Sequence, residues 1–161
     1  MKGRGAQINP DNPFSKHRSA RHPDLTFSKP VEEVNTEYLE THAKTIINKV
    51  DSPDIGLEYS MNPYQGCEHG CVYCYARNTH PYWGYSAGID FESKILVKRD
   101  APQLLTKKLS NPNWVVAPIM LSGNTDCYQP VEAKLKITRQ LLEVLERFHH
   151  PVGVITKSAL I

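Results

Sequence analysis

Three of the four cysteines in this 161-residue chain fall within one eight-residue stretch. They are Cys67, Cys71 and Cys74, in a C-x3-C-x2-C array. Thiolates this close together can share one metal centre. A structural zinc site is closed by four protein ligands and an ordinary four-iron cluster takes four thiolates, so a set of three is informative. A [4Fe-4S] cluster held by three cysteines leaves one iron open to a substrate or a cofactor.

The spacing alone leaves two other uses of these thiols open. A zinc site of the three cysteines and His69 has the right number of ligands. However, His69 lies between two of the cysteines and would need a cramped loop to reach the same ion. A disulfide would leave the third cysteine unpaired, and nothing in the sequence indicates an oxidising compartment. The spacing favours a cluster over zinc and over incidental thiols.

The cysteine array and its surroundings resemble the radical S-adenosylmethionine (SAM) superfamily. An aromatic residue directly before the third cysteine, here Tyr73 before Cys74, is typical of that superfamily's cluster motif. The wider resemblance is to the N-terminal portion of the branch related to spore photoproduct lyase, often labelled "DNA-repair-photolyase-like", and it covers about residues 55 to 161. The similar stretches are Asn62-Pro63-Tyr64-x-Gly66-Cys67, Tyr73-Cys74-Tyr75-Ala76-Arg77, Gly123-Asn124-Thr125-Asp126-x-Tyr128-Gln129-Pro130-x-Glu132 and Thr156-Lys157-Ser158.

This resemblance implies a reaction and its cofactors. In the superfamily the open iron of a [4Fe-4S] cluster chelates the amino and carboxylate groups of SAM. The reduced cluster then cleaves SAM to methionine and a 5′-deoxyadenosyl radical, which abstracts a hydrogen atom from the substrate. A small electron donor of the flavodoxin or ferredoxin type would supply the electron. The substrate is unknown, and nucleic acid is one candidate.

The resemblance also implies which residues hold SAM. Cys67, Cys71 and Cys74 would be the cluster ligands, and Tyr73 would lie along the adenine. Thr125 and Asp126 occupy the family's Ser/Thr-Asp loop, which contacts the methionyl part of SAM or the substrate. Lys157 matches a lysine that pairs with the SAM carboxylate. A half-buried packing role for Tyr73 and a solvated strand-end position for Lys157 are the alternatives.

Two further residues are catalytic candidates beside Asp126. Tyr75 matches a family position linked to radical relay, with a packing tyrosine as the alternative. Spore photoproduct lyase carries a cysteine hydrogen-atom donor just before its Ser-Asp pair, but that position is Gly123 here. The nearest thiol is Cys127, which is a displaced donor or, as we favour, a buried small residue. The resemblance therefore supports the cofactor chemistry better than thymine-dimer repair.

The order of expected elements indicates an α/β fold. Strands are expected over 57–61, 94–98, 114–121 and 152–156. Helices are expected from about 72 to just before 80, from Asp100 to Leu109, and from 131 to 148. This βαβαβαβ order predicts a parallel sheet, and the resemblance makes it a partial parallel (β/α) TIM-type barrel of the radical SAM kind, truncated after about four strands. Catalytic groups are then expected at the C-terminal ends of the strands.

Three segments are expected along the chain. Residues 1–35 are expected to be a disordered basic arm. Residues 1–30 hold six Lys or Arg but only two Asp, and they also contain four prolines. The arm is either a solvated tail, which we favour, or a nucleic-acid contact around Lys16. Residues 36–56 are expected to be a helical lead-in, with a helix over 36–49. Residues 57–161 are expected to be the N-terminal part of a radical SAM core, and the apolar end at Ile161 suggests a longer protein.

Charge and hydropathy narrow the function classes only slightly. The net charge of +2 is too small to argue for nucleic acid by itself. No window approaches the roughly 18 consecutive apolar residues that a membrane span needs, and no apolar segment follows the N-terminus as in a secretory signal. A cytoplasmic protein without membrane contacts is expected. The alternatives to the enzyme are a zinc-stabilised nucleic-acid-binding module and a non-catalytic truncated remnant.

Overall fold

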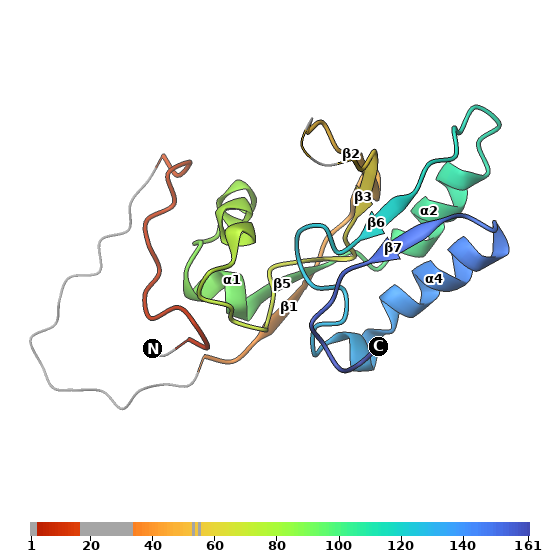
Figure 1. The fold of residues 1–161 in the computed structure, drawn as a ribbon. Helices are drawn as coiled ribbons and strands as arrows, with labels where there is room; N and C mark the ends of the chain where they lie inside the picture. Colours follow the sequence, from red (N-terminus) through yellow and green to blue (C-terminus); the bar gives the residue numbers. More distant parts are fainter. Residues whose placement is uncertain (1–2, 17–33, 53, 55) are drawn as a thin grey trace, which may run out of the picture. The chain divides into compact units, whose positions relative to one another are not determined.

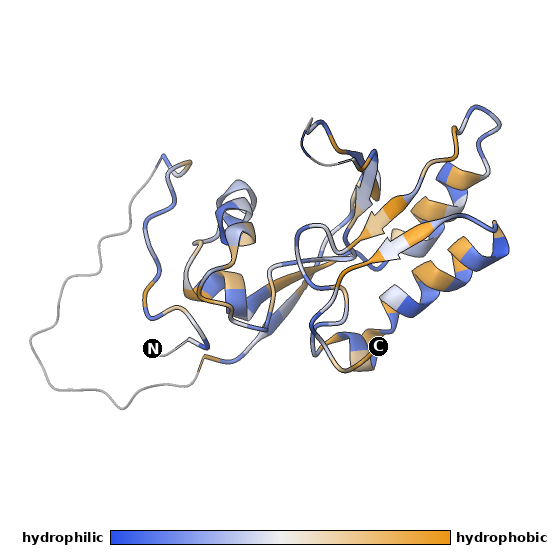
Figure 2. Ribbon diagram, in the orientation of Figure 1, coloured by the Kyte–Doolittle hydropathy of each residue, from blue (hydrophilic) through white to orange (hydrophobic). Residues whose placement is uncertain are grey.

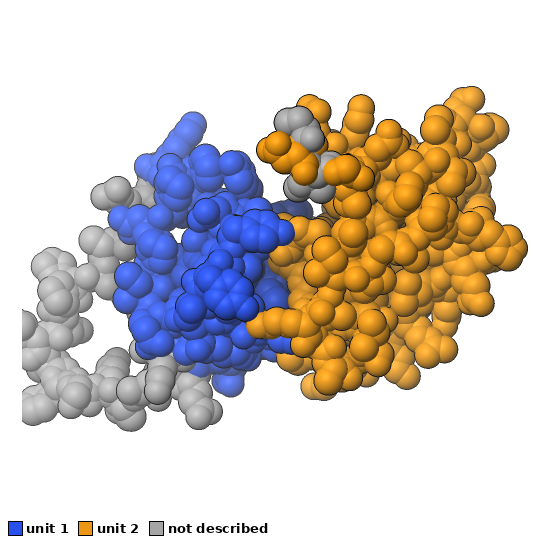
Figure 3. All heavy atoms as spheres, viewed as in Figure 1, with its two compact units in different colours: residues 1–37, 66–95 blue, residues 38–65, 96–161 orange. Residues whose placement is uncertain are grey.

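The computed structural model describes residues 3–16, 34–52, 54 and 56–161 (Figure 1). The chain divides into two compact units, coloured separately in Figure 3. Unit 1 comprises residues 1–37 and 66–95, and unit 2 comprises residues 38–65 and 96–161. The expectation of disorder for residues 17–33 lies outside the described residues.

Unit 2 is built on a four-stranded mixed sheet. The sheet has the order β2-β3-β6-β7, with β2 at Ile47–Lys49, β3 at Tyr59–Met61, β6 at Ile119–Leu121 and β7 at Val152–Val154. β3 and β6 are parallel with Tyr59 opposite Ile119, and β6 and β7 are parallel with Ile119 opposite Val152. The strands expected near 57–61, 114–121 and 152–156 are therefore present, each over a shorter span. The partial barrel stays a prediction.

The strand expected at 94–98 forms, but in a different sheet from the one expected. β5 (Lys94–Val97) lies in a three-stranded sheet of order β1-β5-β4, with β1 at Glu37–Glu40 and β4 at Tyr64–Gln65. It pairs antiparallel with β4, where Val97 is opposite Tyr64. The expectation that all four strands share one parallel sheet is wrong here. A short apolar run indicates a buried strand but not which neighbour it pairs with.

The helix expected over 36–49 is wrong. This stretch contains the strands β1 and β2 instead. β-branched residues favour strands, and Thr45, Ile46 and Ile47 stand in a row at β2. Ile46 and Ile47 are both buried, and Ile47 lies opposite Met61 of β3. Pairing with β3 thus buries the apolar residues that the helical reading had assigned to one helix face.

The long helix expected over 131–148 is interrupted. It consists of α3 (Glu132–Leu135) and α4 (Ile137–Arg147), separated by Lys136 in the left-handed conformation, with φ 53° and ψ 31°. α4 is amphipathic, with apolar residues along one face and hydrophilic residues along the other (Figure 2). It packs against α2 (Ala101–Leu109), which begins after Asp100 as expected.

Unit 1 contains a 3-10 helix, η1 (Tyr75–Trp83), and a short helix, α1 (Ile89–Ser93). η1 replaces the helix expected to end before His80, and it includes Pro81. Cys67, Ala76 and Phe91 form a small buried cluster with Cys74 packed against it. Burial lowers the pKa of His80 to about 4, so this ring is neutral between Tyr85 and Phe91. No helix in the described parts of the chain combines the length and apolarity of a membrane span.

The break at Lys136 leads to a first prediction. A left-handed backbone is unfavourable for a residue with a Cβ and free of that cost for glycine. Lys136→Gly should therefore raise the free energy of unfolding by about 1 kcal/mol. The matched control Lys134→Gly, inside α3, should lower it by about 1 kcal/mol. Urea unfolding measures both, and equal losses in the two variants would contradict a left-handed Lys136.

Candidate functional site

Two glycines shape the loop that carries the three cysteines. Gly66 has φ 81° and Gly70 has φ 64°, a left-handed region that favours glycine. A Cβ on Gly66 would also lie 2.9 Å from the carbonyl oxygen of Lys94. Next to it, the amide of Cys67 donates to the carbonyl of Phe91 at 2.9 Å. The start of the cysteine loop is thus pinned to α1 by backbone contacts.

None of the three thiols is in a disulfide, and they differ in exposure. Cys67 is buried, whereas Cys71 and Cys74 are half-buried. Tyr73 and Tyr75 are 82% and 71% exposed, which rules out a half-buried packing role for either ring in this structure. Cysteine thiolates are the ligand type that iron–sulfur clusters take. Within the described residues no three His, Cys, Asp or Glu side chains are gathered as a metal site. The three thiols would therefore have to move closer together when a cluster binds.

Arg77 braces the backbone of this loop. Its Nε and Nη2 donate to the carbonyl of Cys71 at 3.1 and 3.0 Å, and its Nη1 donates to the carbonyl of Gly88 at 3.2 Å. The guanidinium lies over the ring of Phe91, 5.2 Å from its centroid, and pairs with Glu92. Arg77 therefore connects the loop to α1 through its planar fork of donors.

Glu92 is the buried partner of this network. Its side chain is 1% exposed, and its carboxylate accepts the amides of Arg4 at 2.6 Å, Gly5 at 2.9 Å and Ala6 at 2.7 Å, besides Arg77. Burial alone would raise the pKa of Glu92, but the hydrogen bonds from Gly5, Arg77 and Ala6 outweigh it and lower the pKa. Sequence analysis missed Glu92, because its partners lie far away in the chain.

The expected disorder of the N-terminal arm is wrong for residues 3–16. Residues 3–14, which we call the strap, are bonded along unit 1. The carbonyl of Ile8 accepts the amide of Ile89 at 3.3 Å, and Asn9 exchanges two 2.9 Å hydrogen bonds with Asp90. Near its end, the ring of Phe14 stacks on Tyr82 with centroids 4.7 Å apart. Most of these contacts use backbone groups, which every residue carries. The composition of the segment therefore could not reveal them, and it indicated a solvated arm instead.

In unit 2, the loops after β6 and β7 meet. The carboxylate of Asp126 accepts the hydroxyl of Thr156 at 2.7 Å and the amide of Lys157 at 3.1 Å. Thr125 is buried, and its hydroxyl donates to the carbonyl of Tyr64 at 2.6 Å. The structure thus brings Asp126 and Lys157 together at the C-terminal ends of two adjacent parallel strands, and Lys157 is exposed.

Cys127 faces the interior of unit 2. It is fully buried, its amide donates to Oγ of Ser122 at 2.7 Å, and its carbonyl accepts the hydroxyl of Thr138 at 2.7 Å. Burial raises the pKa of the Cys127 thiol to about 11, so it is protonated at neutral pH. This burial fits the favoured reading of a small core residue, and the donor role stays a prediction.

Several residues of the family-like stretches serve as internal braces of unit 2. The buried hydroxyl of Tyr64 donates to the carboxylate of Glu132, and burial followed by this contact raises the Tyr64 pKa. Glu132 also accepts the amide of Arg139 at 3.2 Å. Lys98, which sequence analysis gave no role, is buried and donates from Nζ to the carbonyl of Asn62 at 2.9 Å. A motif match flagged most of these positions but not what they contact.

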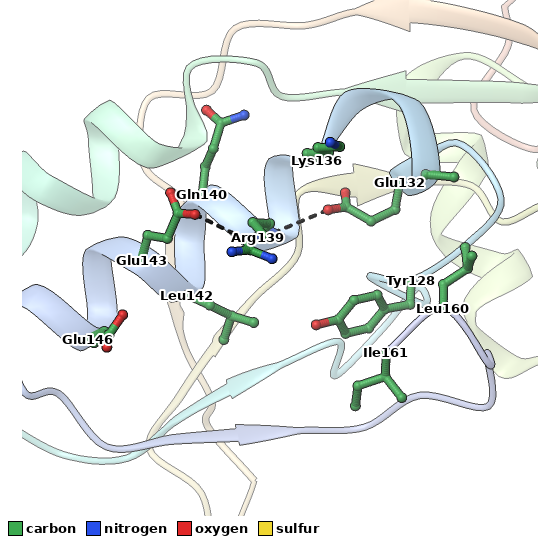
Figure 4. A pocket seen from close by; sticks show the side chains of 11 residues that line it. Tyr128, Glu132, Lys136, Arg139, Gln140, Leu142, Glu143, Glu146, Leu160 and Ile161 are labelled. Atoms are coloured by element: carbon green, nitrogen blue, oxygen red, sulfur yellow. Dashed lines mark hydrogen bonds and ion pairs between the residues drawn. The ribbon is translucent and has the colours of Figure 1, made fainter.

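A pocket of about 970 Å³ lies along α3, α4 and the last residues of unit 2 (Figure 4). Arg139 stands between the carboxylates of Glu132 and Glu143, while Leu160 and Ile161 line the opposite side. None of the predicted site residues lines this pocket. Asp126 lies next to it, because the amide of the lining residue Tyr128 donates to the Asp126 carboxylate at 2.9 Å.

Comparisons with known proteins give relatives without a described function. The chain is 32% identical over 123 residues to the uncharacterized protein Rv2578c of Mycobacterium tuberculosis, covering 76% of this chain and 36% of that protein. It is 31% identical over 125 residues to the uncharacterized protein MJ0683 of Methanocaldococcus jannaschii, covering 78% of this chain and 44% of that protein. The chain thus spans less than half the length of these relatives. No family model matches, and no solved structure gives a significant match.

The lowered pKa of Glu92 gives a pH prediction. Because the folded-state pKa lies below the ordinary value of about 4.3, its stabilisation of the strap is complete above that pH and is lost as the pH falls through the lower value. The NMR shifts of the Gly5 and Ala6 amides, followed downward from about pH 6, should move only once the pH falls below the ordinary value for a glutamate. Glu92→Gln should abolish the transition, and the exposed Glu143→Gln should keep it. Gly5 and Ala6 amide shifts that stay constant as the pH falls would contradict their hydrogen bonds to Glu92.

The Tyr64–Glu132 contact gives a stability prediction. Tyr64→Phe removes the donor to a buried carboxylate, which costs about 1.5–3 kcal/mol in the free energy of unfolding. The control Tyr82→Phe changes an exposed ring and should stay within about 0.5 kcal/mol of the parent. The urea midpoints of unfolding, compared at an unchanged m-value, measure the effect of both substitutions. A parent-like Tyr64→Phe would show that Glu132 does not depend on this hydroxyl.

Proposed function

We propose that this chain is the cluster-bearing part of a radical SAM enzyme that abstracts a hydrogen atom from an unidentified substrate. The observation that carries the proposal is the set of three cysteines, none of them in a disulfide, on one short loop whose backbone is held at Gly66, Cys67 and Cys71. A [4Fe-4S] cluster held by Cys67, Cys71 and Cys74 would supply the electron for reductive cleavage of SAM, the chemistry that starts hydrogen abstraction.

The chain's own residues would then divide the work of binding SAM. Cys67, Cys71 and Cys74 hold the cluster, and the exposed ring of Tyr73 is free to lie against the adenine. Asp126 fixes the backbone of Lys157, and the exposed side chain of this lysine would pair with the SAM carboxylate. Because the carboxylate of Asp126 accepts three local hydrogen bonds, we assign it an orienting role more than proton transfer.

The remaining parts of the proposal concern partners and setting. An electron donor of the flavodoxin or ferredoxin type, a reducing cytoplasmic location and nucleic acid as a candidate substrate are expectations of the same reading. The longer relatives carry more than twice the aligned length, so the activity of a whole protein of that kind is proposed and not that of this chain alone.

The test is anaerobic iron–sulfur reconstitution with a cysteine control. The parent chain should take up about four iron and four sulfide, and the reduced protein should give an electron paramagnetic resonance signal that changes when SAM is added. Cys71→Ala should lose this signal. Cys127→Ala, which changes the buried thiol outside the loop, should keep it.

Two results would overturn the proposal. A colourless protein with one tightly held zinc after reconstitution would identify a zinc-stabilised module instead. A cluster signal that is indifferent to SAM would remove the open-iron chemistry.

A further inference from the structure

We propose that the strap is a built-in clamp on the cysteine loop and that Glu92 is the positioning residue that locks it. Every contact that carries this inference lies within unit 1. Its catalytic consequence rests on the proposed function, whereas the clamp itself does not. This inference gives the N-terminal segment a structural role. Its basic, proline-containing composition did not indicate such a role.

The first attachment is a nest of backbone amides around a carboxylate. Three consecutive amides, from Arg4, Gly5 and Ala6, converge on the side chain of Glu92 at 2.6 to 3.1 Å. Successive N–H groups arranged in this way form a concave anion site. The same carboxylate pairs with Arg77, whose guanidinium holds the carbonyl of Cys71. One buried anion thus connects the strap to the cysteine loop.

The second attachment neutralises a charge beside the thiols. Glu68 follows Cys67 directly and is buried, and its carboxylate lies 3.5 Å from the guanidinium of Arg4. The same Arg4 side chain donates from Nη1 to the carbonyl of Glu92 at 2.6 Å. An unpaired buried carboxylate next to thiolate ligands would oppose their negative charge. Arg4 compensates this charge from outside the loop.

The third attachment is direct backbone contact. A Cβ on Gly5 would lie 1.9 Å from the carbonyl oxygen of Gly70, and a Cβ on Gly70 would lie 2.5 Å from Cβ of Arg4. Neither position has room for a side chain. A small open pocket of about 240 Å³ is also lined from both the strap and the loop region, by Ala6, Ile8, Val72 and Arg77. The strap therefore covers one side of the loop between Cys67 and Cys71.

The clamp has a consequence for the thiols. With the strap in place, Arg77 of η1 links the loop backbone to Glu92 of α1, and Arg4 and Gly5 of the strap contact the loop from another side. With the strap released, the loop loses the Arg4–Glu68 ion pair and one of its covers. We expect Cys71 and Cys74 to become more accessible and an assembled cluster to be lost faster.

The test lifts the strap without touching a cysteine. Gly5→Ala introduces the clash with Gly70, and the matched control Gly56→Ala adds a methyl group where nothing lies within 4 Å. Alkylation of Cys71 and Cys74 in the metal-free full chain should be about tenfold faster in Gly5→Ala, the factor for about 1.4 kcal/mol of lost attachment. Gly56→Ala should match the parent. The buried Cys127 serves as the internal reference in each sample.

A second variant keeps the proposal testable if Gly5→Ala folds poorly. Glu92→Gln preserves the size of the side chain but removes the charge shared by Arg77 and the strap, and Glu143→Gln is its exposed control. Amide hydrogen exchange across residues 66–74 should accelerate in Glu92→Gln and not in Glu143→Gln. Parent-like alkylation and exchange in both strap variants would overturn the clamp.

A separate readout distinguishes this inference from the proposed function. After reconstitution, the rate of cluster bleaching in air should rise in Gly5→Ala relative to Gly56→Ala. If the parent binds no iron, the proposed function fails, while the alkylation and exchange measurements still decide the clamp. If the parent assembles a cluster and the strap variants bleach at the parent rate, the clamp has no role in cluster protection and the inference fails in that part.

Discussion

Unit 1 depends on satisfying one buried negative charge. Removing one partner of a buried ion pair leaves an uncompensated charge and costs about 3–5 kcal/mol, so Glu92 holds its partners tightly. These partners come from the strap and from Arg77, which belong to the two separate sequence segments of the unit. The same charge therefore selects the path of the first residues, the direction of Arg77 and the position of the Cys71 carbonyl. A small unit with a core of few apolar residues gains its definition from this polar centre.

The parts of the fold that sequence predicted are those with local signals. The strand expected over 57–61, just before the cysteine loop, forms as β3, and Asp100 marked the start of α2. The cysteine spacing drew attention to a loop that the structure holds at glycines and backbone carbonyls. The strap could not be found in this way, because its amides are groups that every sequence carries and Glu92 lies 88 residues from Arg4.

Other misses follow from competition between local preference and long-range pairing. Residues 36–49 have enough spaced apolar residues for a helix, but pairing of Ile47 with Met61 decides for a strand. Similarly, the helical pattern after Val131 is continuous in sequence, yet Lys136 turns left-handed where the buried Glu132 accepts the amide of Arg139. Residues such as Tyr64 and Glu132 stood out through resemblance, and the structure gives them a supporting role that resemblance did not specify.

The strap is bound mainly through its backbone groups, and this determines which mutations the segment tolerates. Gln7 is exposed, and its side chain is free to vary in kind. The number of residues between the amide nest at Arg4–Ala6 and the pairing of Asn9 with Asp90 is fixed, because both ends are bonded to neighbouring parts of α1. Deleting or inserting a single residue there would shift every later contact out of register. The segment is thus specified by its length more than by its composition.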